Sequence, residues 1–462
     1  MATADDIIGV LREFVKKIDE TIVDGKREGL LRATEEVYTR YPIDERSIQQ
    51  TDFGVERKNF ALEEIVKESW FYATRAVVWR LQESEAYAAI VKMFNGTVLD
   101  EAKAKRLLGS FAHRVSYRFL ETNDDAQRAE FLSQQLEAVR KHLVEESFQH
   151  LSEVRLIGLV APAKFIEFEA NDTRVLVRRV TADDLIEEQP EFVRREDFPP
   201  TPTAILRLSR VIECEYEIQH AVWQAITILR LFRVGSIREL SYTNETESYF
   251  ALGGKLTAHR HYAVVTNAII GDAVGERLKG FWTQLSQELP LEGYGRDQKR
   301  VDPIETAYQR YSDALLSWGV TVERRISDAV IGLESLFLIE NDELSFRLRL
   351  RLAKLLGMVG FDPYRIQDAI RRAYDVRSAY LHGDQVEPRK VRRIDEQYGS
   401  LNSLLLEVLD YLRCAIVILT MIEPTKAQFI ELVDSSFIDE NAAQKLAEML
   451  AGVKQLLAPQ DR

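Results

Sequence analysis

Residues 363–383 read PYRIQDAIRRAYDVRSAYLHG, and the interpretation of the whole chain starts from this stretch. Proline suits the first turn of a helix, where a backbone N–H has no partner in any case, so Pro363 marks a helix start. Gly383 stands where a C-cap glycine belongs, because glycine adopts left-handed backbone at no steric cost. The stretch therefore predicts one helix over 363–382, which ends on His382.

Arg377 and His382 give the end of this helix a chemistry suited to breaking RNA. Arg377 can hold a phosphate with two parallel hydrogen bonds and stabilise charge on the transition-state oxygens. His382 can exchange a proton with the ribose 2′-hydroxyl or with the leaving oxygen. Five residues advance about 500° along an ideal helix, so the two side chains diverge by about 140°. Their convergence requires either a distortion near Gly383 or a second copy of the chain, which would bring two such pairs into one cleft.

The sequence on both sides of this helix predicts a helical bundle over 303–462. Apolar residues step by three and four from Ile304 through Trp318 to Phe337, which predicts one helix of about 35 residues. Further helices are expected over 344–359, 390–422, 424–433 and 440–457, with Pro424 in a first turn.

Residues from about 303 to 430 resemble a HEPN domain, and more narrowly its Apea-like branch. That family has an Arg-x4–6-His motif in a helical bundle, and its Apea-like branch often reads Tyr-x-x-Arg-Ser-x-x-x-His-Gly. The upstream text also fits, with AVIGLESLF at 329–337 and FRLRLRLA at 346–353. The register of the motif is occupied here by Tyr374, Arg377, Ser378, His382 and Gly383. The resemblance implies a metal-independent endoribonuclease that acts at a dimer interface, without a cofactor, in phage defence or toxin systems.

The resemblance also implies roles for individual residues. His382 would be the general acid and base, and Arg377 the phosphate clamp. Ser378 stands at the position where many HEPN nucleases have an amide residue. A serine at this position suits the Apea-like branch. Glu334 is expected to pair with an arginine of the second helix of the bundle, over 344–359, in a structural role and not a catalytic one. The supporting residues are Tyr374, Asp375, Ser378 and Glu334. The alternative is that Arg377 and His382 form a surface helix end with ion pairs to Asp375 or Asp384.

The chain is acidic overall but contains a local basic segment. Its 462 residues carry a formal net charge of −13, which excludes coating of nucleic acid by bulk positive charge. Residues 345–395 nevertheless contain twelve basic and six acidic side chains, a balance of +6 that could steer an RNA backbone. RNA contacts are expected from Arg347, Arg351, Arg371 and Arg372. The alternative is that Arg347, Arg349 and Arg351 only cover a helix with solvated charge.

The rest of the chain predicts a helical region over 1–150 and a mixed α/β region over 151–300, so the fold class is α+β and predominantly helical. Helices are expected over 7–18, 62–83, 84–94, 100–121 and 125–150. Alternating residues around Ala170-Asn-Asp-Thr predict a β-hairpin, and 204–214 predicts a third strand. A proline-containing loop is expected over 190–202. After it we expect a helix over 218–232, a strand over 259–266 and a helix over 272–287.

Several kinds of site are excluded or disfavoured. Cys214 and Cys414 are too few for a disulfide framework and suit a reducing cytosol. The segment around Lys255 lacks the first glycine and the Ser or Thr of a phosphate-binding loop. His259 and His261 could share a strand face, but no third metal ligand stands nearby. The tryptophans Trp70, Trp79, Trp223 and Trp282 are interpreted as core residues.

A cytoplasmic location is expected, because the N-terminus has no signal peptide and the apolar stretch 415–422 is too short to span a bilayer. The favoured function is an endoribonuclease of antiviral defence by abortive infection, or of toxin type, with tRNA as one candidate substrate. A homodimer and a phage-derived trigger are the expected partners, and the first 300 residues would restrain the nuclease or sense that trigger. The alternatives are a non-catalytic scaffold or sensor that dimerises through its bundle and, third, a metal-dependent hydrolase.

Overall fold

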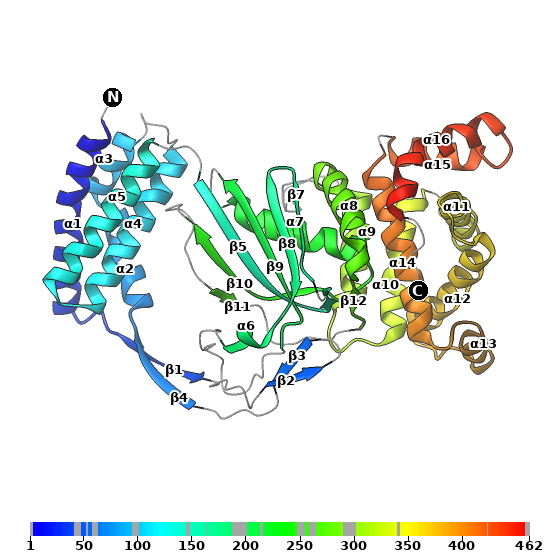
Figure 1. Ribbon diagram of the computed structural model, residues 1–462, viewed down its shortest axis with the longest axis horizontal. Coiled ribbons are helices and arrows are strands. Elements are labelled where there is room, and N and C mark those ends of the chain that lie inside the picture. Colours follow the sequence, from blue (N-terminus) through cyan, green and yellow to red (C-terminus); the bar gives the residue numbers. More distant parts are fainter. Residues whose placement is uncertain are drawn as a thin grey trace.

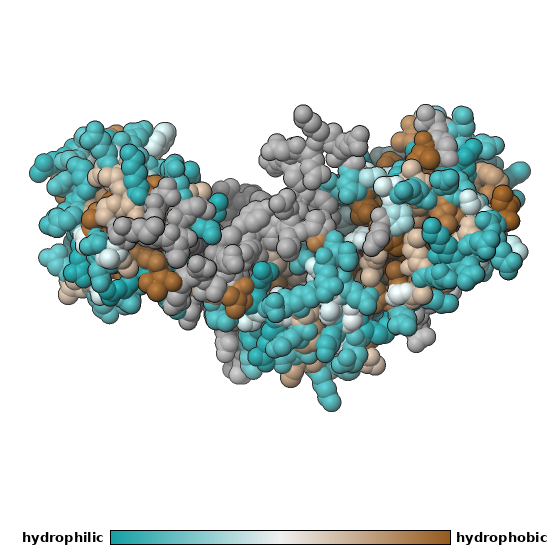
Figure 2. Space-filling model, turned by 90° about the horizontal axis from the view of Figure 1, so that it is seen from above, coloured by the Kyte–Doolittle hydropathy of each residue, from teal (hydrophilic) through white to brown (hydrophobic). Residues whose placement is uncertain are grey.

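A computed structural model describes residues 3–40, 48–51, 54–57, 63–94, 101–144, 148–162, 164–186, 201–212, 216–246, 255–257, 265–289, 302–339, 342–422 and 424–457. A helical bundle lies at one end, a sheet in the middle and a second helical bundle at the other end (Figure 1). The predominantly helical α+β class predicted from the sequence is therefore confirmed. In the view from above, hydrophilic residues cover most of the described surface of both bundles (Figure 2). Separate hydrophobic patches lie among these hydrophilic residues.

The N-terminal bundle has a hydrophobic core of its own. Its helices are α1 (Ala4–Arg27), α2 (Phe71–Gln82), α3 (Glu85–Phe94), α4 (Glu101–Glu121) and α5 (Asp125–Val144). The apolar stripe of α1 that begins at Ile7 is buried, as its spacing predicts. Thr3 and Asp6 form a capping box that starts this helix.

Two predicted helices of this region are partly wrong. Residues 63–69 form strand β4 (Glu63–Ser69), which pairs antiparallel with β1 (Thr34–Arg40). A second hairpin joins β2 (Ile48–Thr51) to β3 (Gly54–Arg57). The predicted helix over 125–150 ends at Val144, and β5 begins at Phe148. In both places a pairing strand distant in sequence decides the structure, and helical spacing alone cannot reveal such a partner.

The middle of the molecule is a six-stranded sheet with the order β11-β10-β5-β9-β8-β7. The strands are β5 (Phe148–Ile157), β7 (Ile166–Ala170), β8 (Thr173–Arg179), β9 (Ala204–Ile212), β10 (Arg238–Thr246) and β11 (Lys255–Thr257). The predicted hairpin is confirmed as β7 and β8, and Asn171 and Asp172 have φ of 47° and 60° at its turn. The predicted third strand is β9.

Helices α7 (Tyr216–Phe232) and α8 (Gly275–Glu288) pack on one face of this sheet, and 3₁₀ helix η2 (Asp272–Val274) leads into α8. Phe168 of β7 meets Trp282 of α8 edge to face at 5.7 Å. A short parallel pair joins β6 (Leu159–Val160) to β12 (Ala268–Ile269). Most of the predicted strand over 259–266, with His259 and His261, and much of the proline-containing loop lie outside the described residues.

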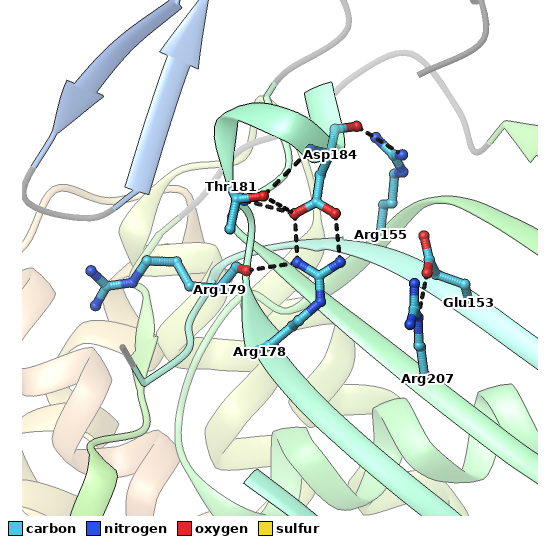
Figure 3. Close-up of polar contacts among 7 residues, drawn as sticks. All are labelled: Glu153, Arg155, Arg178, Arg179, Thr181, Asp184 and Arg207. Atoms are coloured by element: carbon cyan, nitrogen blue, oxygen red, sulfur yellow. Dashed lines mark hydrogen bonds and ion pairs between the residues drawn. The ribbon is translucent and has the colours of Figure 1, made fainter. Parts of the chain in front are cut away.

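The opposite face of the sheet carries a polar network (Figure 3). Residues 154, 177 and 206 point into the core, so their neighbours Arg155, Arg178 and Arg207 point to the other face. Arg178 forms a two-bond ion pair with Asp184 of the short helix α6 (Ala182–Ile186), and Thr181 donates its N–H and Oγ1–H to the same carboxylate. The pKa of Asp184 falls to about 2, because these hydrogen bonds outweigh the opposing effect of burial.

Replacing Asp184 with asparagine should therefore lower the free energy of unfolding by about 1–2 kcal/mol at pH 7. A carboxylate with a lowered pKa contributes stability that is present above its unfolded pKa of 3.8 and is lost as the pH falls through about 2. Urea unfolding at pH 7 and pH 3 checks both points, with the exposed neighbour Asp183 replaced by asparagine as the matched control. An equal effect of the two substitutions at pH 7 would contradict the expectation.

The C-terminal bundle shares one continuous hydrophobic core with the sheet. Its helices are α9 (Pro303–Leu316), α10 (Val322–Phe337), α11 (Leu344–Met358), α12 (Pro363–His382), α13 (Pro388–Tyr398), α14 (Leu401–Thr420), α15 (Lys426–Ser435) and α16 (Glu440–Leu457). Helix α14 is buried along most of its length, and α10 packs against α9, α12 and α14. This packing places one side of α10 against the helix that carries the Arg-x4-His motif.

Two long helices expected in this bundle are each broken in two. The helix over 304–337 divides into α9 and α10 because Gly319 adopts left-handed backbone (φ 71°) and Thr321 caps α10. The helix over 390–422 divides at Gly399 (φ 83°), after which Ser400 caps α14. Pro424 precedes the Thr425 cap of α15 and does not lie in the first turn.

Trp79 and Trp223, expected in the core, are 69% and 61% exposed, whereas Trp282 is buried as predicted. Within the described part of the chain, helices long and apolar enough to cross a bilayer are absent.

Candidate active site

Helix α12 has the predicted start and the predicted end. Asp362 caps its N-terminus by accepting a hydrogen bond from the N–H of Tyr364 at 2.9 Å. At the C-terminus Gly383 adopts left-handed backbone (φ 74°). The N–H of Gly383 donates to the backbone carbonyl of Tyr380 at 3.1 Å, and the N–H of Asp384 donates to the backbone carbonyl of Ala379 at 2.9 Å. These two bonds form a Schellman motif. The helix therefore stays regular through His382.

Glu334 of α10 joins two residues of the motif, and we call Glu334, Tyr374 and Arg377 the Glu334 cluster. Arg377 Nη2 lies 3.0 Å from Glu334 Oε2, and Tyr374 Oη donates to Glu334 Oε1 at 2.6 Å. The Arg377 guanidinium also lies 5.7 Å from the centre of the Tyr374 ring. Burial and the hydrogen bond to Glu334 raise the pKa of Tyr374 well above its usual range, so its hydroxyl remains a donor at neutral pH. Glu334 therefore pairs with an arginine, but the partner is Arg377 of α12 and not an arginine of the predicted second helix.

Arg377 is anchored at one side and partly exposed at the other. Its side chain is 22% exposed, so the guanidinium reaches the surface of the bundle. Its Nε–H is buried and makes no hydrogen bond within the part of the chain that the structure describes. An anion that approached this helix would meet a cation already held in one orientation.

His382 and Ser378 lie exposed on α12. Because α12 is regular to its last residue, His382 and Arg377 diverge around the helix axis by about 140°. The distortion that would bring them together within one subunit is not present. Asp375 pairs with Lys390 of α13 at 2.8 Å, so it is not the partner of either residue.

The four arginines expected to contact RNA have different environments. Arg351 is 2% exposed, and Arg372 is also buried, beside Asp368 at 3.3 Å. These two lie inside the bundle and are not presented to a polynucleotide, which corrects their expected surface role. Arg371 is half-exposed and forms an ion pair with Asp368. Arg347 is partly exposed, and its Nε lies 4.0 Å from Glu343 Oε2.

Acidic residues outside the basic segment neutralise part of its excess charge. Glu334, Glu407 and Asp434 pair with Arg377, Arg365 and Arg351 respectively. Exposed cations remain on α13, whose buried position is Ile394; they are Arg389, Arg392 and Arg393. The ion pair between Lys390 and Asp375 holds α13 beside the last turns of α12. The local sequence RKVRR signals these cations, and the fold places their helix against α12.

Cys414 is fully buried in α14, and burial raises the pKa of its thiol to about 12, which makes it an inert core residue. Groups of three or more histidine, cysteine, aspartate and glutamate side chains arranged to hold a metal ion do not occur among the described residues. Comparison of the chain with protein-family models, with curated proteins and with solved structures finds no match.

Proposed function

We propose that this protein is a metal-independent endoribonuclease of the HEPN type. The observation that supports the proposal is the Glu334 cluster, which holds a part-buried Arg377 on the same helix that ends at an exposed His382. Preorganisation of a cation before substrate arrives is what electrostatic stabilisation of a transition state requires. The exposed imidazole supplies a group that can accept and donate a proton.

The proposed reaction uses the RNA's own 2′-hydroxyl as nucleophile. The 2′-oxygen loses its proton to an imidazole and bonds to the adjacent phosphorus, while the bond from phosphorus to the 5′-oxygen breaks. An imidazolium protonates the leaving 5′-oxygen, and Arg377 stabilises the charge on the non-bridging oxygens. The products are a 2′,3′-cyclic phosphate and a 5′-hydroxyl, and no metal or cofactor takes part.

The proposed active form is a homodimer. Within one subunit the two side chains point to different sides of α12, so Arg377 would act with the partner's His382. Each of the two sites would then use one imidazole, which takes the proton of the 2′-hydroxyl and, as imidazolium, protonates the leaving 5′-oxygen. The exposed cations of α13 would hold the RNA backbone on either side of the cleft.

The biological setting that accompanies this proposal is antiviral defence by abortive infection, or a toxin system, in the cytoplasm. An RNase that cleaves tRNA is toxic to its own cell, so its activity must be restrained. We assign that restraint, or the sensing of a phage-derived trigger, to the N-terminal bundle and the sheet. The hydrophobic core that the sheet shares with the C-terminal bundle would transmit this restraint, or the signal of the trigger, to the nuclease.

Incubation of the purified protein with labelled tRNA in excess EDTA tests the activity. We expect cleavage to persist, to leave cyclic phosphate ends, and to stop at any position that carries a 2′-deoxynucleotide. Arg377→Ala and His382→Ala should each lower the rate by about 10²–10⁴-fold, whereas the exposed Arg12→Ala should not change it. Loss of cleavage on chelation, or full activity in both active-site variants, would defeat the mechanism.

The competing function is a non-catalytic scaffold that dimerises through the bundle. The ion pair of Arg377 with Glu334 favours it, because the same contact can simply tie α12 to α10. The two functions differ in the dimer structure. Active-site pairs that face each other across a basic cleft support the nuclease, and pairs on separate solvent faces support the scaffold.

A further inference from the structure

A surface groove lies on the N-terminal bundle, far in sequence from the Glu334 cluster. It has a volume of about 1350 Å³ and is lined by α2, α3 and α4. On α2 the lining residues Phe71, Arg75, Trp79 and Gln82 recur at helical spacing and form one stripe. On α4 a second stripe includes Lys105, Arg106 and His113 and contains the small residues Gly109 and Ser110.

Three aromatic side chains of this groove, all on α2, are exposed to an unusual degree. Phe71, Tyr72 and Trp79 are 45%, 63% and 69% exposed, although all three belong to one helix of 12 residues. Exposed apolar side chains gathered in one place mark an interaction site more often than scattered ones do. The rings of Phe71 and Tyr72 meet edge to face at 5.5 Å, and the His113 ring lies 6.3 Å from Phe71.

The groove is also positively charged in an acidic protein. Its lining contains one acidic residue, Glu101, and four cations, which are Arg75, Lys92, Lys105 and Arg106. Glu101 is already paired with Lys105 at 2.6 Å. The Arg75 guanidinium lies 5.8 Å from the centre of the Phe71 ring. Burial, together with the charges of Arg114 and Arg75, lowers the pKa of His113, which is consistent with a positive field in the groove.

We propose that this groove binds single-stranded nucleic acid. Flat exposed rings give unpaired bases a surface for stacking, and cations interleaved with them contact the phosphates between those bases. An acidic peptide could satisfy the cations, but it would leave Trp79, Tyr72 and Phe71 without flat partners. A duplex could not stack on them, because its bases are already paired and stacked. Neither stacking nor phosphate contact uses the 2′-hydroxyl, so RNA and DNA should both bind.

The test measures binding of fluorescein-labelled U12 and dT12 to the full-length chain by anisotropy, in a His382→Ala background so that the RNA stays intact. Trp79→Ala should weaken binding of both oligonucleotides about tenfold, because stacking of a base on an aromatic ring is lost. Arg75→Ala with Arg106→Ala should lower the slope of log K against log salt by about 1.4, since each phosphate contact on a single strand contributes about 0.7.

Matched controls separate the groove from general charge and exposure. Trp223→Ala removes a similarly exposed tryptophan on α7, and Arg12→Ala with Lys16→Ala removes two exposed cations of α1. Neither should change the affinity for dT12 beyond twofold. The proposal is overturned if neither oligonucleotide binds, if a 12-base-pair duplex binds as tightly as the single strands, or if Trp79→Ala has no more effect than Trp223→Ala. Binding is measured without cleavage, so these outcomes do not depend on the nuclease proposal.

Discussion

Two inactive variants should restore RNA cleavage when they are mixed. Arg377→Ala and His382→Ala subunits each lack one member of the proposed pair, and in the proposed dimer the other subunit supplies the missing member, because the two side chains of one α12 diverge. A heterodimer therefore contains one complete site and one doubly deficient site. With free subunit exchange, half of the dimers are heterodimers, so the mixture should recover about a quarter of the wild-type rate. The measurement is tRNA cleavage after the two variants are mixed, unfolded and refolded together.

The control for this experiment is a mixture in which one subunit carries both substitutions. The double variant mixed with Arg377→Ala leaves no complete site in any dimer, so it should remain as inactive as either single variant. Recovery in this control, or no recovery in the first mixture when its heterodimer has been detected by mass spectrometry, would contradict a site shared between subunits.

Much of the site around α12 could be predicted because its determinants are local. A proline at the start, a glycine at the end and the spacing from Tyr374 to His382 all lie on one helix, and each acts within a few residues. The sequence predicts that Glu334 pairs with an arginine of the helix over 344–359, but its partner in the structure, Arg377, lies 43 positions away on α12. The breaks at Gly319 and Gly399 escaped prediction because the apolar spacing continues across both glycines. Both glycines adopt left-handed backbone, which the apolar spacing alone does not reveal.

Exposure was harder to predict than secondary structure. From sequence alone, an arginine in a helix is expected to be a surface charge and a tryptophan is expected to be a core residue. In the structure Arg351 is buried and Trp79 is exposed. In both cases the deciding feature is a partner, or its absence, on an element distant in sequence. Asp434 lies 83 residues from Arg351, and in the described structure Trp79 faces a groove. The proposed nucleic-acid groove on α2 was missed for this reason.

Replacing Arg351 with alanine should destabilise the fold by about 2–4 kcal/mol. Arg351 Nε and Nη2 contact the two oxygens of Asp434 at 2.8 and 2.7 Å, and Nη1 donates to the carbonyl of Phe337 at 2.8 Å. One buried guanidinium thus joins α11 to α15 and to the end of α10, and its removal leaves both acceptors without their donor. The Asp434 side chain is 46% exposed and can be rehydrated, which keeps the cost below that of a fully buried pair.

Urea unfolding separates this structural role from RNA binding. Arg349→Ala, on the same helix, removes an equal charge from a less buried side chain and should cost about 0.5 kcal/mol or less. Asp434→Asn should also destabilise the fold, and a double-mutant cycle with Arg351→Ala should give a coupling energy of about 1–3 kcal/mol. An RNA-contacting arginine behaves in the opposite way, because its loss weakens binding and leaves the unfolding midpoint unchanged. Unaltered stability in Arg351→Ala, with weakened RNA binding, would return this residue to the surface role that the sequence suggested.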